Sequence, residues 1–280
     1  MKNSILLLLS AVAAVSASCV RDPLVRTTHF KSLTRRQAEG TVPVSTFGYT
    51  DLKGPFNWYG LNKSTNGACA YGHHQSPIVI HSSTPYASEA INFNIPDVKS
   101  AKFENIGTNV EVVITNGTLW VGNKEYKLEQ FHFHTPGEHR FFEEFYPMEL
   151  HFVLQASDST YAVVGFVVQL CTSDESNSFL NDVFANIDDI AIPGTYTETG
   201  PLSFGDIEAH LYHHPIYQYT GSLTTPPCTE GVNWLISNEP LKLDVNTYNK
   251  VKKIVKFNAR YTANEPGKPN LLEVAAADFP

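Results

Sequence analysis

Clusters of basic residues and long apolar segments are scarce in this 280-residue chain. The formal net charge is −8 at pH 7, and no stripe of lysine and arginine has the pattern that tracks a phosphate backbone. The composition therefore argues against nucleic acid as a partner. Beyond the N-terminal stretch, no segment is apolar over the roughly 20 residues that a membrane-spanning helix needs, so no membrane partner is predicted.

Low-complexity linkers and internal repeats are also missing. The length fits one or two domains, and all-β chains of this size often have one core. We therefore predict one domain, residues 37–280. Before it, residues 1–17 combine one lysine with an apolar run and a Val15-Ser16-Ala17 end, which predicts a signal peptide and a secreted protein. Arg35-Arg36 marks either the end of a propeptide, residues 18–36, or a solvated charge pair.

Cysteines are few, and their spacing matches neither a zinc finger nor a Cys-x-x-Cys redox pair. Their pairing cannot be derived from the sequence. If Cys19 lies in a removed segment, one disulfide and one buried thiol is the simplest assignment for Cys69, Cys171 and Cys228. Cys171 ends an apolar run and is the best candidate for the thiol. N-glycosylation sequons begin at Asn62 and Asn116, both in polar, turn-like sequence.

Alternating apolar and polar residues, rich in β-branched and aromatic types, dominate the rest of the chain. Turn signals such as Asn116-Gly117 separate successive strands and favour antiparallel pairing. Helical spacing is clear only in 246–257, behind the capping residue Asp244, and weaker in 178–187. We predict a mainly β single domain built on a large twisted, mostly antiparallel central sheet with short peripheral helices. The predicted strands are 110–114, 119–121, 126–134, 148–155, 161–170, 216–219 and 232–237.

Three histidines lie on two of these strands, at His132, His134 and His151. Side chains two apart on a strand share a face, so His132 and His134 project together, while Phe131 and Phe133 enter the opposite layer. A third imidazole from a paired strand completes three corners of a tetrahedron. Three histidines with a vacant fourth position are typical of catalytic zinc, because structural zinc sites close that position, usually with cysteine.

Polar neighbours strengthen the metal interpretation. Gln130 shares the face of His132, and Glu149 shares the face of His151 by the same parity. Such groups can hold the other ring nitrogen of a ligating histidine and fix its tautomer. The alternative is that these are strand histidines satisfied by ordinary hydrogen bonds. The set as a whole favours the metal site.

The chain resembles the α-class carbonic anhydrases at these residues. His132-Phe133-His134, Glu138-His139, Glu149-Leu150-His151 and the stiff segment Ser222 to Pro227 match that family's motifs in order and spacing. Threonine follows His134 where animal members have tryptophan, which is similar to secreted fungal, bacterial and plant members. The resemblance runs from about Phe47 to the C-terminus and includes Gly48-Tyr49, Gly54-Pro55, Trp58, Gln75-Ser76-Pro77 and Asn258-Ala259-Arg260.

The resemblance implies a zinc enzyme, a carbonic anhydrase, that reversibly hydrates carbon dioxide to bicarbonate and a proton. His132, His134 and His151 are its expected zinc ligands. The expected outer partners are Gln130, Glu149 and the backbone carbonyl of Asn258. Thr224 is expected to donate to Glu138 and to orient zinc-bound hydroxide toward the substrate. The implied substrate pocket, whose members could also be ordinary core, is Val153, Val163, Leu223, Thr225 and Trp234.

The resemblance also implies a Cys69–Cys228 disulfide and cis peptide bonds at Ser76-Pro77 and Pro226-Pro227. One departure concerns proton transfer: many fast members carry a histidine where this chain has Thr108, which cannot shuttle protons near neutral pH. Turnover is therefore expected to depend on buffer. A homodimer through Cys171 or the glycosylated face is a further hypothesis.

Two other interpretations compete with this one. Cupin dioxygenases also use His-x-His-x-x-x-Glu, which His132, His134 and Glu138 fit, but Tyr126 stands where their glycine is expected and their later Pro-x-Gly-x-x-His element is missing before His151. The second is a binding module without catalytic activity, which would be favoured if residues of the metal site were missing from the sequence. All three histidines, Thr224 and Glu138 are present.

Overall fold

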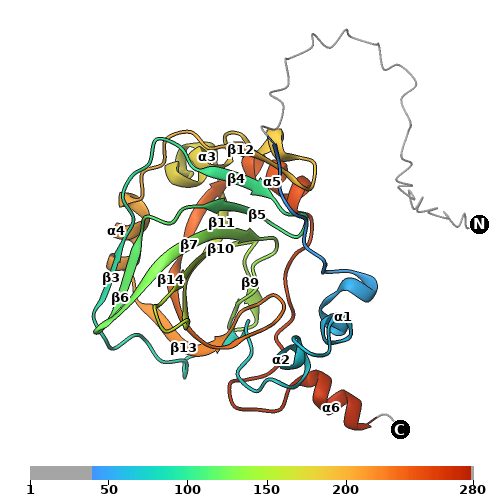
Figure 1. Ribbon diagram of the computed structural model, residues 1–280. Coiled ribbons are helices and arrows are strands. Elements are labelled where there is room, and N and C mark those ends of the chain that lie inside the picture. Colours follow the sequence, from blue (N-terminus) through green and yellow to red (C-terminus); the bar gives the residue numbers. More distant parts are fainter. Residues whose placement is uncertain (1–39, 279–280) are drawn as a thin grey trace, which may run out of the picture. The chain divides into compact units, whose positions relative to one another are not determined.

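Most strands of the protein pair in one large sheet, as the alternating pattern predicts. The computed structural model describes residues 40–278, and the predicted signal peptide and propeptide lie outside them. The sheet has eleven strands, and its main path runs β1-β12-β4-β5-β7-β10-β11-β14-β13, with β6 beside β7 and β3 beside β6 (Figure 1). All its pairings are antiparallel except that of β11 with β14. The predicted fold class is confirmed.

The strands of the large sheet are β1 (Gly40–Thr41), β3 (Ile91–Asn94), β4 (Lys102–Asn105), β5 (Val110–Val113), β6 (Thr118–Val121), β7 (Lys124–His134), β10 (Met148–Gln155), β11 (Tyr161–Cys171), β12 (Thr195–Glu198), β13 (Ile216–Ser222) and β14 (Glu230–Asp244). A second sheet contains β2 (Val79–Ile80), β8 (Arg140–Phe141) and β9 (Glu144–Phe145). The α-helices are α1 (Trp58–Leu61), α2 (Gly67–Tyr71), α3 (Ser178–Phe184), α4 (Gly205–His213), α5 (Val245–Val255) and α6 (Leu271–Asp278). Short 3-10 helices cover Asp51–Lys53, Pro55–Asn57, Ser173–Glu175 and Ile187–Ile190.

One face of the large sheet is closed by the main hydrophobic core. Phe131, Phe133 and Phe152 are fully buried there, against α3, α4 and α5. Because side chains alternate along a strand, the residues between them must face the other side. The aromatic positions of β7 and β10 therefore turn the intervening histidines away from the main core.

The helices are short and lie at the margins of the sheet (Figure 1). The helix expected behind Asp244 is confirmed as α5, and the Asp244 side chain accepts from the backbone N–H groups of Asn246 and Thr247 at 2.9 and 3.1 Å. The weaker prediction at 178–187 corresponds to α3 and the start of the next 3-10 helix. No helix within residues 40–278 is both long and apolar enough to cross a bilayer.

The cysteines behave largely as expected. Cys69 in α2 and Cys228 form the implied disulfide across 159 positions of sequence, beside the buried Trp58. Ser76-Pro77 and Pro226-Pro227 are cis, as is Thr135-Pro136. Cys171 is a free thiol, but the prediction that it is buried is wrong: it ends the long strand β11 and is half-buried.

Candidate metal centre

The three histidines converge because β7 and β10 pair in antiparallel register. His132 lies directly opposite His151, and His134 lies opposite Glu149. One ring nitrogen of each histidine lies within 4.8 Å of those of the other two, and the Nε2 atoms of His132 and His134 are 3.0 Å apart. The parity argument therefore places all three rings on one face of the sheet, at one point.

Each imidazole has its other nitrogen held by an oxygen acceptor. The Nδ1–H of His132 donates to Gln130 Oε1 at 2.9 Å, and that of His134 donates to the Asn258 carbonyl at 2.8 Å. The Nε2–H of His151 donates to Glu149 Oε1 at 2.6 Å. A carbonyl and a carboxylate oxygen can only accept, so these bonds place the proton on the outer nitrogens.

The inner nitrogens are therefore unprotonated, and their lone pairs face one another. Burial holds the pKa of His132 well below its usual value, with the neighbouring imidazoles acting in the same direction, and burial lowers that of His134 to about 3. The rings are thus neutral near pH 7 and cannot satisfy one another by hydrogen bonds. A cation at their centre removes this mutual repulsion, and neutral imidazoles are ligands that zinc prefers. The donor set fits a zinc ion.

Glu149 anchors a buried network behind His151. Its Oε1 accepts from both His151 and the Nδ1–H of His139, each at 2.6 Å, and its Oε2 accepts from the backbone N–H groups of Glu138 and His139. Burial alone would raise the pKa of Glu149, but the two imidazoles outweigh it and hold the pKa well below its usual value. His139 Nε2 lies 2.7 Å from the Tyr219 hydroxyl. His139 is therefore tied into the support of the site and does not face its centre.

Glu138 lies beside the inner nitrogens. Its Oε2 is 3.4 Å from His134 Nε2 and 4.0 Å from His151 Nδ1, while Oε1 accepts from the backbone N–H of Arg260 at 2.8 Å. Oε2 has no hydrogen-bond partner at ordinary distance among residues 40–278. Burial raises the pKa of this carboxyl well above its usual value, and the Arg260 N–H and the Thr224 hydroxyl act to lower it. Thr224 is thus near Glu138, as expected, without a direct bond at the ordinary distance.

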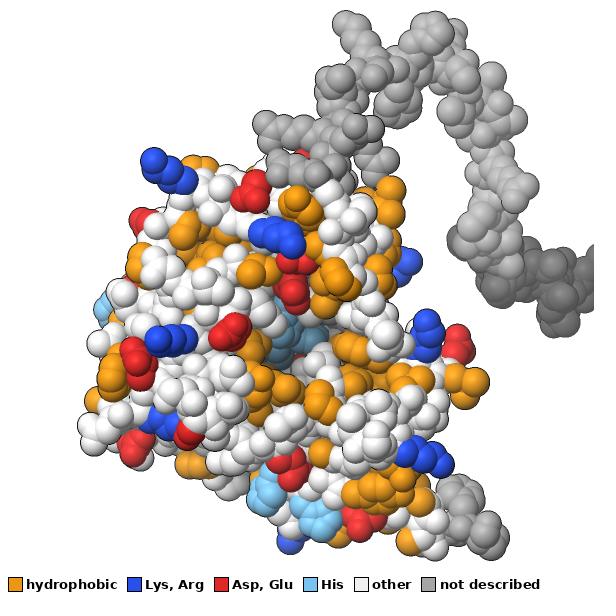
Figure 2. Space-filling model, in the orientation of Figure 1, with side chains coloured by type: hydrophobic (Ala, Val, Ile, Leu, Met, Phe, Trp, Pro, Cys, Tyr) orange, Lys and Arg blue, Asp and Glu red, His pale blue; other side chains and the backbone are white. Residues whose placement is uncertain are grey.

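A cavity of about 230 Å³ opens over the histidines. Pale-blue histidine side chains are visible at the bottom of a hollow in Figure 2. The structure brings all five predicted pocket residues to this cavity, together with Gln130, His132, His151 and Thr224. Tyr161 also lines it, which the sequence analysis missed. It lies two residues before Val163 on β11, so the same face parity could have found it.

Comparisons with known proteins agree with this geometry. The sequence profile of the eukaryotic-type carbonic anhydrases matches residues 53–270. The chain belongs to the eukaryotic-type carbonic anhydrase family. The solved structure of the fungal α carbonic anhydrase from Aspergillus oryzae is 53% identical, covers 84% of this chain and all of its own, and has a TM-score of 0.81.

Curated carbonic anhydrases from other kingdoms are more distant. Alpha carbonic anhydrase 5 of Arabidopsis thaliana is 33% identical over 67% of this chain and 68% of its own length. The carbonic anhydrase of Neisseria gonorrhoeae is 31% identical over 68% of this chain and 73% of its own. The predicted enzyme class and the predicted likeness to fungal, bacterial and plant carbonic anhydrases are confirmed. The family assignment removes the cupin interpretation.

Glu149 offers a test of the supporting network in this carbonic anhydrase. In Glu149→Gln, an amide NH₂ replaces one oxygen, so at least one donor from His139, His151 or the backbone loses its acceptor. We expect the affinity for zinc to fall roughly 10- to 100-fold, because partners of this kind orient the ligands. Competition with a fluorescent zinc chelator measures the change. The exposed Glu125→Gln is the control, and equal zinc affinity of both variants would contradict this role.

Proposed function

We propose that this carbonic anhydrase uses zinc, held by His132, His134 and His151, to hydrate carbon dioxide reversibly to bicarbonate and a proton. The observation that carries the proposal is the convergence of three buried, unprotonated ring nitrogens beneath a cavity. Bound zinc lowers the pKa of water to about 7, a value known from carbonic anhydrases themselves, and so makes a nucleophile available at neutral pH. Three uncharged ligands suit this because they leave the charge of the cation largely uncompensated.

The neighbouring residues orient the ligands and the reactants. Gln130, Asn258 and Glu149 keep the proton on the outer nitrogen of each ring, so the inner nitrogens stay available. Glu138, when ionised, can only accept, so in the proposed hydrogen bond between the two residues the Thr224 hydroxyl is the donor and presents a lone pair to the cavity. An attacking water oxygen that donates to Thr224 is thereby aimed toward the substrate carbon.

An apolar wall suits an apolar, uncharged substrate. Val153, Val163 and Leu223 line the cavity beside the buried Trp234, whose indole N–H donates to the Ser222 carbonyl at 2.9 Å. That bond fixes the ring and leaves only its apolar surface toward the cavity. Carbon dioxide can contact this wall without losing hydrogen bonds. A water molecule in the same place would find no hydrogen-bond partner in the wall. The product bicarbonate, being charged, leaves such a wall readily.

Metal analysis with a rate assay tests the proposal. We expect one zinc per chain in purified protein, and we expect stopped-flow hydration of carbon dioxide to cease after removal of zinc by a chelator and to return when zinc is restored. Magnesium is the control ion, since it prefers oxygen ligands. A rate unaffected by complete zinc removal would overturn the proposal.

Proton transfer to solvent gives a second prediction. The Thr108 hydroxyl is occupied by Ser45 at 2.8 Å and does not titrate near neutral pH. We expect turnover in weak buffer to be limited by proton removal and to rise with imidazole, and Thr108→His to raise turnover in weak buffer roughly tenfold. Thr108→Gln is the matched control. A rate insensitive to imidazole would show that another group carries the proton. Glu111 is then the first residue to examine, because it pairs with His132 across β5 and β7, and burial together with Glu104 raises its pKa to about 7.

We propose in addition that the protein is secreted after removal of residues 1–17. The Cys69–Cys228 disulfide supports an oxidising compartment. Asn62 and Asn116 are both exposed, so a glycan on either side chain can stay in water. The propeptide 18–36 stays a prediction that N-terminal sequencing of the secreted protein tests. The homodimer also stays a prediction, and sedimentation of the purified protein tests it.

A further inference from the structure

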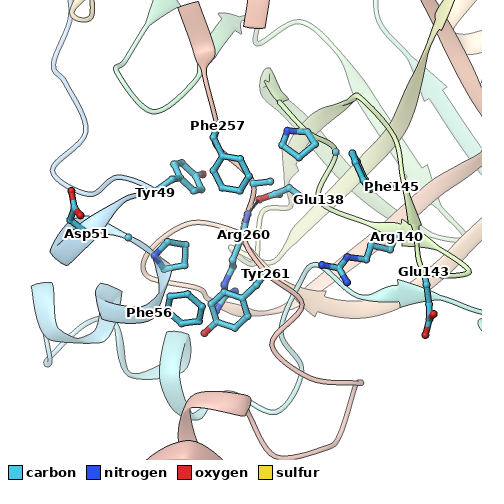
Figure 3. A pocket seen from close by; sticks show the side chains of 15 residues that line it. Tyr49, Asp51, Phe56, Glu138, Arg140, Glu143, Phe145, Phe257, Arg260 and Tyr261 are labelled. Atoms are coloured by element: carbon cyan, nitrogen blue, oxygen red, sulfur yellow. Dashed lines mark hydrogen bonds between the residues drawn. The ribbon is translucent and has the colours of Figure 1, made fainter. Parts of the chain in front are cut away.

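A second cavity, larger than the one over the histidines, is lined in part by Glu138. Its volume is about 540 Å³, and none of its lining residues lines the histidine cavity. The buried floor includes Glu138 and Arg260, and Figure 3 shows aromatic side chains gathered around it. The volume lies in the range of sites that bind small molecules. The proposed carbon dioxide chemistry makes no use of this cavity.

The walls are aromatic and unusually exposed. Phe56, Phe145 and Phe257 are 75%, 65% and 56% exposed, although phenylalanine is mostly buried in folded proteins. The ring of Phe56 stacks on that of Tyr261, with centroids 4.8 Å apart and planes inclined by 15°. These rings come from three separate segments and meet at one cavity. An exposed apolar group of this kind is typical of a binding site.

Several polar groups in the cavity lining have no partner among residues 40–278. The hydroxyls of Tyr49 and Tyr261 are buried without a hydrogen bond. In Arg260, which is 3% exposed, both Nη atoms donate to backbone carbonyls, at 2.8 and 3.2 Å, while Nε donates to none. Buried polar groups are normally satisfied, so these donors behind the cavity wall are an unusual group of unpaired atoms.

Arg140 adds a positive charge at the rim. Its side chain makes no hydrogen bond or ion pair with any described residue, and Figure 3 shows its guanidinium directed toward the cavity. The carboxylates of Asp51 and Glu143, also at the rim, point away from the centre (Figure 3). On the floor, the Glu138 carboxyl turns Oε2 toward His134 and His151, and its Oε1 accepts from the Arg260 backbone N–H. The charged group that Figure 3 shows directed into the cavity is therefore the Arg140 cation.

We infer that this cavity binds a small planar aromatic carboxylate. A ring of that size can lie against Phe257 and the Phe56–Tyr261 stack, where aromatic pairs gain from offset or edge contacts. The carboxylate can then accept from Arg140, which forms bidentate bonds with such groups. A cationic ligand would meet the like charge of Arg140, and an aliphatic acid leaves the aromatic walls unfilled. The inference does not depend on zinc or on the hydration reaction.

Benzoate is the probe, titrated calorimetrically into the zinc-loaded protein. We expect saturable binding of one benzoate per chain, weakened roughly tenfold in Arg140→Gln by loss of a charge-assisted bond and also weakened in Phe257→Ala. Both residues are exposed, so both variants should fold. Lys127→Gln and Trp120→Ala, exposed positions that line neither cavity, are the matched controls. Cyclohexane carboxylate should bind more weakly than benzoate.

Three results overturn the inference. The first is the absence of saturable benzoate binding. The second is binding that Arg140→Gln and Phe257→Ala leave unchanged, which would place benzoate elsewhere, for example at the metal. The third is a dimer in sedimentation that Phe257→Ala dissociates, since the cavity would then hold side chains of a second copy. Because calorimetry reports binding alone, failure of this inference leaves the proposed function untouched, and an inactive protein can still bind benzoate.

Discussion

His132→Ala is expected to lose bound zinc and to reduce carbon dioxide hydration at least about a thousandfold, since without the cation the pKa of water stays far above neutral pH. The variant suits the test because His132 lies at the cavity, and its partner Gln130 is only half-buried and can turn to water. Truncation there enlarges a solvent-accessible cavity and leaves the main core intact. Zinc content by atomic emission, stopped-flow rates and circular dichroism together measure the result.

The control for this variant is His213→Ala. His213 is exposed near the end of α4 and remote from the site in the fold, so zinc content and rate should stay unchanged. If His132→Ala retained one tightly bound zinc per chain together with its activity, the metal would have to be held elsewhere. The nearest alternative is the group formed by His139, Glu149 and His151. Its short hydrogen bonds argue against that, because they already occupy the facing atoms.

The second large effect is expected at Thr224 and Glu138. Each of Thr224→Ala and Glu138→Gln should keep zinc and lower turnover about a hundredfold, within the range for a positioned proton-handling group. Glu138→Gln retains an oxygen for the Arg260 backbone N–H and nearly the same volume, so the fold should persist. The proposed function makes the two residues one relay, and on that proposal the double variant should be no slower than the slower single variant.

Thr224→Ser sharpens the test, since serine keeps the hydroxyl and should recover most of the rate. Turnover is compared at equal zinc occupancy in saturating buffer, so that proton removal to solvent does not hide the difference. Losses that multiply in the double variant would mean independent roles for the two residues. A serine variant as slow as the alanine variant would mean that Thr224 acts by packing.

The strands that position the site could be predicted because their residues carry a strong period of two. In β7, aromatic residues alternate with the histidines, and in β10, Leu150 and Phe152 alternate with Glu149 and His151. Several other elements gave no such signal. β4 and β12 carry many polar residues, and α4 buries only Ile207 and Leu211 along its length. Pairing with neighbours stabilises these elements more than their own pattern does.

Some residues that support the metal site could be predicted from the sequence, and others are brought to it only by folding. Gln130 and Glu149 were found from their position beside the histidines on the same strands. Tyr219 lies 80 positions from His139, and the two meet at 2.7 Å only in the folded chain. The aromatic cavity is also formed by segments distant in the sequence, and none of its exposed phenylalanines has a pattern that marks it.

Alternation along single strands thus determined which side chains face together, because strand geometry is local and needs no knowledge of the partner strand. The antiparallel register of β7 with β10 decided that His151 meets His132, since a shift of one residue would send it to the main core. Tertiary packing alone decided that Glu138 lies beside the inner histidine nitrogens and also lines the aromatic cavity, and that five aromatic rings share that cavity. Contacts between distant segments depend on the closure of the whole core, which no local pattern encodes.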